Sequence, residues 1–444
     1  MRRGDFLVMN PRLLLLLTLA LLTALARVSP SVAAERRPNV VLIISDDQGW
    51  QDYSFMGHPA VRTPHLDRLA AQSLTFTRGY VPSSLCCPSL ASIITGRYPH
   101  QHRVTSNDPP LVPGLRAADF QRSAAFREGR EVMNRHLEAV PTLPRLLARR
   151  GYLSLQTGKW WQGDFRRGGV TDGMTTGARH GDEGLKIGRE TMQPVRDFID
   201  KATEAQKPFF VWYAPMLPHT PHNPPERLLA QYRDKAPSLQ VAKYWAMCEW
   251  FDESCGQLLN HLDRKGLADN TIVVYVTDNG WIQDPEADRY APRSKQSPYD
   301  GGIRTPLMIR WPGKVKPQRS EEPALSIDIA PTLLSALGDK PETGMQGIDL
   351  LDERARSRRK TVFGECFTHN AVDLQNPAAN LRWRWVIDGD WKLILPAPQN
   401  EPDGKPELYR IRQDPNEEKD LAAAEPEAVR RLTKRLNDWW PGRP

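Results

Sequence analysis

Four runs of apolar residues stand out along the chain, and each is long enough for one buried β-strand. They cover residues 40–44, 208–213, 271–276 and 306–311. Continuous apolar, β-branched runs are typical of strands covered on both faces, as in a mainly parallel sheet. Helical spacing occurs between them, at residues 64–70, 143–150 and 241–264. This alternation predicts the α/β class, with a large central, mainly parallel sheet sandwiched by helices.

The pattern changes after residue 350. The basic, polar residues 354–360 are typical of a linker. Two short strands around Gly389-Asp390 predict an antiparallel hairpin, and a C-terminal amphipathic helix is expected at residues 427–440. We therefore expect a large α/β domain over residues 35–350 and a smaller C-terminal α+β domain over residues 355–444.

One internal segment has no clear pattern. Residues 107–135 are polar and only weakly periodic, and we expect a long surface insertion there.

The first 34 residues have the organisation of a secretory signal peptide. Basic residues precede an apolar run over residues 13–26, and the small residues Val32-Ala33-Ala34 follow. The run is shorter than the ~20 apolar residues that span a bilayer. We therefore expect removal of residues 1–34, a secreted or periplasmic protein, and no membrane association after cleavage.

Composition and charge narrow the class of protein. The chain has 444 residues, of which 40% are hydrophobic and 25% charged, which is ordinary for a globular protein. The formal net charge is +7, and it falls to +4 without the four arginines and one aspartate of residues 1–34. No Lys/Arg-rich block with interleaved aromatic residues is present, so we expect no nucleic-acid partner.

The cysteines do not form a disulfide framework. Five is an odd, sparse number, and their spacing fits no zinc site. Pro88 suits a helix start and Gly96 a helix end, which places Cys86 at the positive end of a helix. That position binds anions and lowers a thiol pKa. The alternative is that Cys86 is a small buried apolar residue.

Acidic residues follow two of the predicted strands. Asp46 and Asp47 come after residues 40–44, and Asp278 with Asn279 comes after residues 271–276. Because the carboxyl ends of parallel strands meet at one edge of a sheet, these side chains can lie together. Carboxylate and amide oxygens are hard ligands, which suit Ca²⁺ or Mg²⁺.

Cys86-Cys87-Pro88-Ser89 is followed, after five residues, by Thr95-Gly96-Arg97. This motif resembles the signature of the type I sulfatases of the alkaline phosphatase superfamily. Other segments resemble further motifs in the family's order, across roughly residues 37–313: Asp46-Asp47-Gln48-Gly49, Gly158-Lys159-Trp160, Pro218-His219, Thr277-Asp278-Asn279-Gly280 and Lys295. Each match alone is weak, but together they are specific.

The resemblance implies an alkaline-phosphatase-like fold and a secreted sulfatase that acts on a sulfated sugar, polysaccharide or aryl sulfate. It implies that a maturation enzyme oxidises Cys86 to formylglycine, whose hydrated aldehyde attacks the sulfate sulfur. The implied catalytic residues are Cys86, Lys159, His219 and Lys295. The implied ligands of Ca²⁺, with Mg²⁺ as the less favoured ion, are Asp46, Asp47, Cys86, Asp278 and Asn279.

Two residues depart from the family pattern. Leu90 stands where the family has arginine, and Trp161 stands where it often has histidine. Two other functions therefore stay open: a phosphate or phosphonate ester hydrolase, and a non-catalytic protein that binds sulfated glycans. Among the remaining histidines, His222 is a weaker candidate, and we expect His100 and His102 to be structural.

Overall fold

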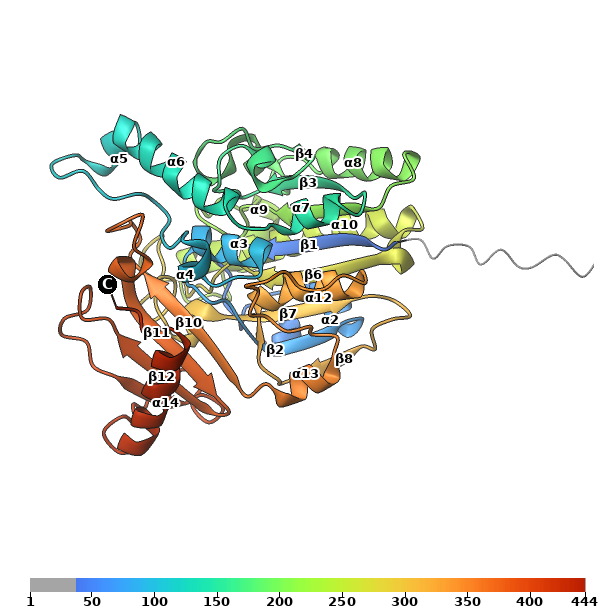
Figure 1. The fold of residues 1–444 in the computed structure, drawn as a ribbon. Helices are drawn as coiled ribbons and strands as arrows, with labels where there is room; N and C mark the ends of the chain where they lie inside the picture. The colour runs from blue at the N-terminus through green and yellow to red at the C-terminus, as the bar shows by residue number, and fades with distance from the viewer. Residues whose placement is uncertain (1–36, 444) are drawn as a thin grey trace, which may run out of the picture. The chain divides into compact units, whose positions relative to one another are not determined.

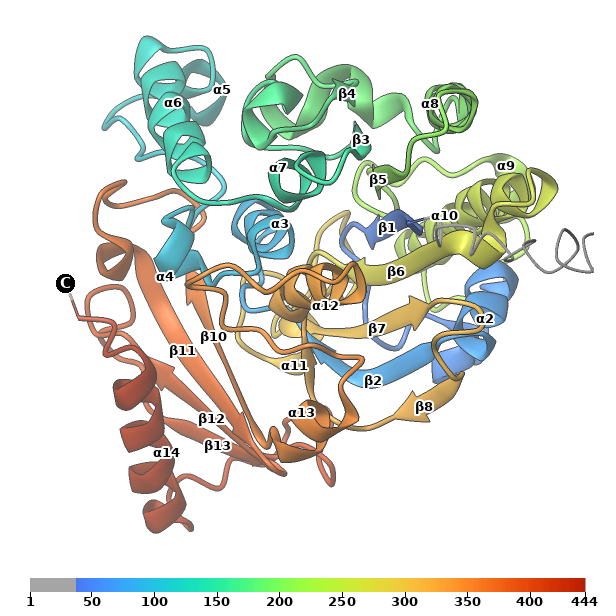
Figure 2. The same ribbon diagram turned by 45° about the vertical axis from the view of Figure 1, so that its right-hand side comes forward.

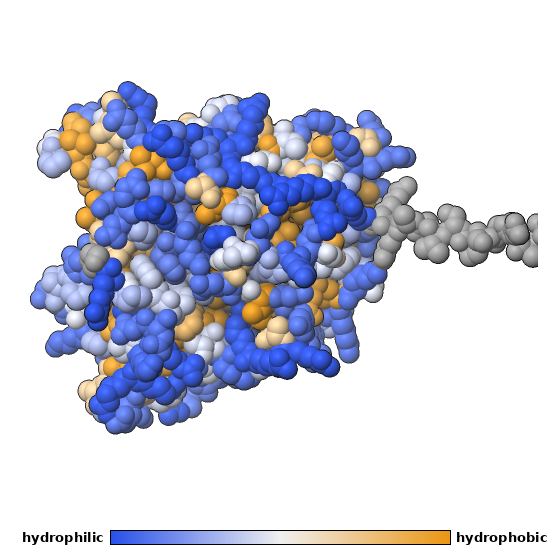
Figure 3. All heavy atoms as spheres, viewed as in Figure 1, coloured by the Kyte–Doolittle hydropathy of each residue, from blue (hydrophilic) through white to orange (hydrophobic). Residues whose placement is uncertain are grey.

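The computed structural model describes residues 37–443. The predicted signal peptide, residues 1–34, lies outside the described residues. Within them, no helix is both long and apolar enough to cross a membrane. On the face drawn in Figure 3, apolar residues form only small patches within a largely hydrophilic surface, as is usual for a protein that meets water.

A nine-stranded sheet in the order β4-β3-β5-β1-β6-β7-β2-β8, with β9 beside β2, forms the centre of the larger part (Figure 1). Every pair is parallel except those of β7 with β6 and β2. The predicted mainly parallel sheet is confirmed, and all four apolar runs lie in it. The strands are β1 (Asn39–Ser45), β2 (Leu74–Tyr80), β3 (Leu153–Gly158), β4 (Asp172–Gly173), β5 (Phe209–Ala214), β6 (Thr271–Thr277), β7 (Arg304–Arg310), β8 (Gln318–Ser320) and β9 (Ala324–Leu325).

Helices cover both faces of this sheet (Figures 1 and 2). The main ones are α2 (Pro64–Ala71), α3 (Cys86–Thr95), α7 (Leu143–Ala148), α8 (Gln193–Glu204), α10 (Leu239–Arg264) and α12 (Ile329–Ala336). In β1, Val40, Leu42 and Ile44 join the core beneath α3, α7 and α12, whereas Val41 and Ile43 join the core beneath α2, α8 and α10. The central strand is thus buried on both faces, which explains its unbroken apolar run.

The C-terminal part is an antiparallel sheet of four strands, with one helix packed on it. The expected hairpin is confirmed: two neighbouring strands are joined through Gly389, whose φ of 64° suits a residue without a Cβ. The elements are β10 (Thr361–Phe367), β11 (Leu381–Asp388), β12 (Trp391–Pro396), β13 (Glu407–Arg410) and α14 (Pro426–Trp439).

A buried lysine of β12 links this sheet to the larger part. The Nζ of Lys392 lies 2.9 Å from Asp300 Oδ1 and 2.6 Å from Glu417 Oε1. Asp300 opens α11 (Asp300–Ile303), which directly precedes β7. The C-terminal sheet therefore holds a turn of the larger part through an ion pair.

Two segments contain more regular structure than their sequences suggested. The expected surface insertion at residues 107–135 includes α5 (Ala117–Phe120) and most of α6 (Ala124–Glu138), where Ser123 accepts a hydrogen bond from the Phe126 N–H. The expected linker contains α13 (Glu353–Arg358). The polar exposed faces of these helices hide the few apolar positions that pack inward.

The remaining elements are short. They are α4 (Pro99–His102), α9 (Glu226–Leu229), and the 3₁₀ segments η1 (Ser54–Met56), η2 (Phe165–Gly168), η3 (Arg179–Lys186), η4 (Ala268–Asn270), η5 (Ser326–Asp328) and η6 (Pro377–Asn380). Within η3, residues 180–182 depart from helical backbone angles.

Candidate active site

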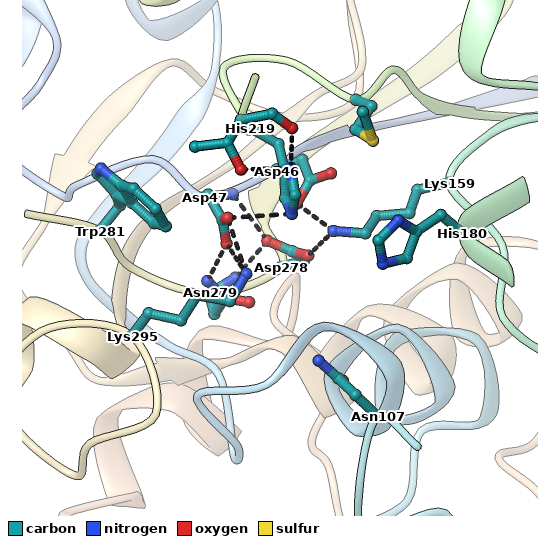
Figure 4. A network of polar contacts seen from close by, with 12 residues as sticks. Asp46, Asp47, Asn107, Lys159, His180, His219, Asp278, Asn279, Trp281 and Lys295 are labelled. Atoms are coloured by element: carbon teal, nitrogen blue, oxygen red, sulfur yellow. Dashed lines mark hydrogen bonds and ion pairs between the residues drawn. The ribbon is translucent and has the colours of Figure 1, made fainter. Parts of the chain in front are cut away.

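The two acidic segments meet at one edge of the central sheet, as the sequence predicted. Ser45 at the end of β1 is in register with Thr277 at the end of β6. The backbone N–H of Asp47 donates to Asp278 Oδ1 at 3.1 Å, and the Asn279 side-chain amide donates to Asp47 Oδ1 at 2.6 Å. Four polar residues from segments 231 positions apart thus form one cluster (Figure 4).

Two buried lysines contact these carboxylates. Lys159, which follows β3, places Nζ 2.5 Å from Asp46 Oδ1 and 3.7 Å from Asp278 Oδ2. Lys295 places Nζ 2.6 and 2.7 Å from the two oxygens of Asp47. Both predicted lysines therefore lie in the cluster, on opposite sides of the acids (Figure 4).

His219 enters from the segment after β5, which is held beside β1 by a hydrogen bond from the Asp46 N–H to Leu217 O at 3.0 Å. Its Nδ1 lies 2.6 Å from Thr220 O. A carbonyl can only accept, so Nδ1 carries the proton and the lone pair of Nε2 faces Asp47 Oδ2 at 3.3 Å. Two acceptors at this distance favour a proton or a cation between them.

Cys86 opens α3, and Gly96 ends this helix in the left-handed conformation, as predicted. The ligand atoms of Asp46, Asp47, Cys86 and His219 all lie within 4.8 Å of one another. The expected lowering of the thiol pKa is wrong for the folded chain. Burial raises the pKa of Cys86 to about 12, although Lys159 and Lys295 act to lower it.

Burial and charge set the ionisation of the cluster. Burial raises the pKa of Asp46 well above its ordinary value despite Lys159, and burial also raises that of Asp278. Burial acts in the same direction on Asp47, but Lys295, His219 and Lys159 together hold its pKa well below its ordinary value. Acids pushed toward neutrality by each other and by burial gain from added positive charge.

The donor set fits a hard divalent cation. Three buried oxygens, Asp46 Oδ2, Asp278 Oδ2 and Asn279 Oδ1, have no hydrogen-bond partner among the described residues. A buried polar oxygen without a partner costs free energy, and a cation that these oxygens coordinate removes that cost. The oxygen ligands suit Ca²⁺ or Mg²⁺ better than a soft metal.

A cavity of about 270 Å³ opens onto the cluster. Besides Cys86, His219 and Lys295, its lining includes residues that the sequence patterns did not single out as site residues: Asn107, Arg179, His180, Tyr290 and His369. No local pattern marks these residues: Arg179 and His180 open η3, and the other three lie outside the helices and strands. Trp281 also lines the cavity; it directly follows Asp278-Asn279-Gly280, a placement that could have indicated it.

The two residues that depart from the family pattern are buried. Leu90 packs in the same apolar core as Cys86. Trp161 is 1% exposed, and the centroid of its ring lies 5.4 Å from the guanidinium group of Arg130 and 4.8 Å from that of Arg179. Leu90 and Trp161 thus pack as apolar residues where the family has polar ones. The guanidinium groups near Trp161 come from other segments of the chain.

Three further histidines, His100, His102 and His222, lie outside the cluster. His102 contacts Ser92 Oγ through Nε2 at 3.0 Å, and His100 contacts Glu365 through Nδ1 at 3.0 Å. Both contacts are compatible with the expected structural role. His222 is 8% exposed and packs against Tyr244 and Trp281.

Comparison with known proteins identifies the family. Residues 38–339 match the family model described as Sulfatase, and residues 293–439 match the model described as N-sulphoglucosamine sulphohydrolase, C-terminal. The chain belongs to the sulfatase family. This confirms the resemblance and, at the level of the family, the expectation of a sulfuric ester hydrolase.

The sulfatases most similar to this chain include two from mammals. Human arylsulfatase A is 30% identical over 402 residues, which cover 78% of this chain and 73% of the relative. Mouse N-acetylgalactosamine-6-sulfatase is 29% identical, and the match covers 84% of this chain and 76% of the relative. Among solved structures, Ps i-CgsB has a TM-score of 0.73 at 21% identity, covering 92% of this chain and 94% of that chain. The last comparison shows the fold, and confirms the predicted α/β class.

Proposed function

We propose that this sulfatase-family protein hydrolyses sulfate esters of a carbohydrate, with formylglycine made from Cys86 by a maturation enzyme, and with Ca²⁺ held by Asp46, Asp47, Cys86, Asp278 and Asn279. The observation that carries the proposal is the burial of Cys86 at the start of a helix, beside three carboxylates, two lysines and one histidine.

The charge of the cluster supports a monoanionic substrate. Three carboxylates and two ammonium groups leave one negative charge, and a divalent cation turns it into one positive charge. A sulfate monoester carries a single negative charge and makes the sum zero. Buried charge is stable only when it is compensated, so the site favours a monoanion over a dianion.

The lysines are placed to bind the sulfate oxygens. Lys159 and Lys295 are both nine-tenths or more buried and approach the acids from two sides. Burial acts to lower the pKa of each lysine, but the carboxylates and Cys86 hold both pKa values above their ordinary range. Both ammonium groups therefore stay charged and can stabilise the negative charge that grows on the sulfate in the transition state.

His219 is placed to protonate the leaving alcohol. Its Nδ1–H is fixed by Thr220 O, so the nitrogen that exchanges protons with a substrate is Nε2. Burial lowers the pKa of His219 well below its ordinary value, and Lys159 lowers it further. Nε2 must therefore take up a proton before it can act, which the negative charge of a bound sulfate ester favours, and it can then give that proton to the alkoxide of the leaving group.

The two groups that the chain does not itself encode supply the rest of the chemistry. When bound, Ca²⁺ adds positive charge at the carboxylates. Formylglycine supplies, as its hydrate, a hydroxyl nucleophile in place of the protonated Cys86 thiol.

The substrate class follows from the cavity and from the relatives. At about 270 Å³ the cavity lies near the lower end of ligand pockets, roughly 300 Å³. One sulfated sugar or aryl group fits this size better than an interior stretch of polymer. Relatives named for N-acetylgalactosamine-6-sulfate, and the structure of Ps i-CgsB with k-i-k-neocarrahexaose, favour a sulfated glycan. Secretion after removal of residues 1–34 would bring the protein to such glycans.

Mass spectrometry of the peptide that contains Cys86, combined with product analysis, tests the proposal. Protein purified from its natural source should carry formylglycine at position 86 and release sulfate from sulfated monosaccharides, and Cys86→Ala should release none. An unmodified thiol together with no sulfate release contradicts the proposal. Release of phosphate alone identifies a phosphate or phosphonate ester hydrolase instead. Glycan binding without hydrolysis identifies a non-catalytic binding protein.

A further inference from the structure

His180 lies in the active-site cavity although no motif indicated it. It shares the lining of this cavity with Cys86, His219 and Lys295. Its ring centroid lies 5.8 Å from that of His219 and 4.5 Å from that of Trp161, and Figure 4 places the ring beside Lys159. A second imidazole therefore faces the reaction centre from a segment outside the family motifs.

The hydrogen bonds of His180 fix which nitrogen carries its proton. Nη1 of Arg179 lies 2.7 Å from His180 Nε2. A guanidinium can only donate, so Nε2 accepts and the neutral ring carries its hydrogen on Nδ1. Among the described residues no acceptor lies within hydrogen-bond distance of Nδ1, which leaves one N–H donor for the cavity.

Arg179 is itself held in place. Its Nε and Nη2 donate to the two oxygens of Asp108 at 3.0 and 2.9 Å, and its guanidinium lies over the Trp161 ring at 4.8 Å. A two-point contact and an aromatic face fix the plane of the guanidinium. The tautomer of His180 is thus set by a rigid donor rather than by solvent.

The backbone around His180 is strained and supported. His180 has φ of 72° and Asp182 has φ of 37°, both in the region that side chains with a Cβ disfavour. The Asp182 carboxylate accepts backbone N–H groups of Thr176, Gly177, Ala178 and Glu183. The His180 carbonyl accepts the Trp160 N–H at 2.9 Å. Strain that is held by this many contacts is typical of positioned functional residues.

Resting on the proposed function, we infer that His180 is a substrate-binding residue whose Nδ1–H donates a hydrogen bond to an oxygen of the substrate's sulfate group. It complements His219, because His219 presents a lone pair at Nε2 whereas His180 presents a donor at Nδ1. One imidazole exchanges a proton and the other stabilises negative charge. This donor comes from η3 and lies close to Trp161, which stands where the family often has histidine.

Substitution with alanine and asparagine tests this role. His180→Ala should lower kcat/KM for a sulfated monosaccharide on the order of 10²-fold, since the loss of one donor to a developing anion has this effect. The side-chain amide of His180→Asn places an N–H near the position of Nδ1. This variant should therefore have a kcat/KM at least tenfold above that of His180→Ala. The acidic and basic limbs of the pH–rate profile should stay where they are in both variants, because the role involves a donor that does not titrate.

His136→Ala is the matched control. This histidine is half-buried on α6, outside the cavity, with Nε2 at 2.8 Å from Leu374 O, and its loss should leave kcat/KM within threefold. Equal activity of wild type and His180→Ala overturns the inference, as does an asparagine variant no better than alanine at an unchanged thermal midpoint. A lost limb of the pH–rate profile would instead make His180 an acid or base.

Titration with inorganic sulfate separates this inference from the proposed function. If wild-type protein hydrolyses no sulfate ester, the proposed function fails, whereas His180 still predicts a dissociation constant for sulfate at least tenfold higher in His180→Ala. An unchanged dissociation constant overturns the inference whether or not the protein is active.

Discussion

Two buried ion clusters in this molecule both combine acidic and basic side chains but differ in the balance of their charges. The first, proposed to be catalytic and called the catalytic cluster below, consists of Asp46, Asp47, Lys159, Asp278 and Lys295. The C-terminal ion cluster consists of Asp300, Arg304, Lys392 and Glu417. In the second, two acids meet two cations, so the charges balance, although Asp300 Oδ2 and Glu417 Oε1 have no hydrogen-bond partner among the described residues. In the first, three acids meet two cations, and Asp46 Oδ2 also lacks such a partner.

This difference in charge balance separates a cluster that can bind a cation from one that only supports the fold. A cluster that compensates its own charge needs nothing more and stabilises the fold through its geometry. A cluster with excess negative charge is less stable alone and gains by binding a cation. Burial and distance alone do not distinguish the two clusters, but the sum of their charges does.

The largest expected effect comes from Asp278→Ala. It removes one of the proposed ligands, so metal binding and sulfate release should both be lost, the latter by roughly 10³-fold or more. The thermal midpoint of Asp278→Asn, which keeps an oxygen for the backbone N–H groups of Asp47 and Asn279, should not fall in chelator, because this variant removes only surplus negative charge. A marked fall in the thermal midpoint would mean that the catalytic cluster stabilises the fold, as the C-terminal ion cluster does.

Removal of the metal should mimic this substitution. Treatment with EDTA should abolish activity, and Ca²⁺ should restore it more fully than Mg²⁺. At 100 times its dissociation constant, Ca²⁺ should stabilise the folded state by about 2.7 kcal/mol, as read from the thermal midpoint. Asp278→Ala should show no such shift. Activity that survives chelation would show that the proposed site assignment is wrong.

Lys392→Met should act on stability. It leaves Asp300 and Glu417 buried with one cation fewer, and such losses typically cost about 3–5 kcal/mol of unfolding free energy, measured by urea denaturation. Lys434→Met is the control, because Lys434 forms an exposed pair with Asp438. That substitution should change the free energy by about 0.5 kcal/mol or less. Equal effects would contradict the proposed difference between buried and exposed pairs.

A smaller effect concerns pH. Burial raises the pKa of Glu417 to about 7 from an ordinary value of 4.5, despite Lys392. The folded state therefore holds a proton that the unfolded state has released, and the contribution of Glu417 to stability falls as pH rises from about 4.5 to about 7. In Glu417→Gln this fall should be absent, so the variant's thermal midpoint should decline less across that range. Parallel curves for the two proteins would contradict the raised pKa.

The sequence predicted the catalytic cluster better than the C-terminal ion cluster. The acids of the first follow β1 and β6 directly, and the unbroken apolar runs of these strands identify them as central and parallel. Lys392 lies within a β-hairpin, 92 residues from Asp300, and its own surroundings read as an ordinary strand. Only the packing of the two sheets brings these residues together.

His180 and α6 could not be predicted for related reasons. His180 depends on backbone angles that are set by Asp182 and by the close approach of Gly181 to the end of β3, neither of which has a local sequence signature. In α6 the buried positions include Gly129 and Asn134 besides Phe126, Met133 and Leu137, so the apolar period along the helix is weak. Roles argued from the motifs, such as those of Lys159 and Lys295, stay predictions until the experiments above are done.

The burial of Cys86 also constrains the order of events in the life of the protein. The side chain is 1% exposed in the folded chain, so a second enzyme cannot reach its sulfur. Any enzymatic conversion of Cys86 must therefore precede the folding that buries it in the core that it shares with β1 and β6. The pairing of these two strands joins residues 232 positions apart, so this core closes only after both parts of the chain are present. A chain that folds before conversion would keep an unmodified thiol at position 86.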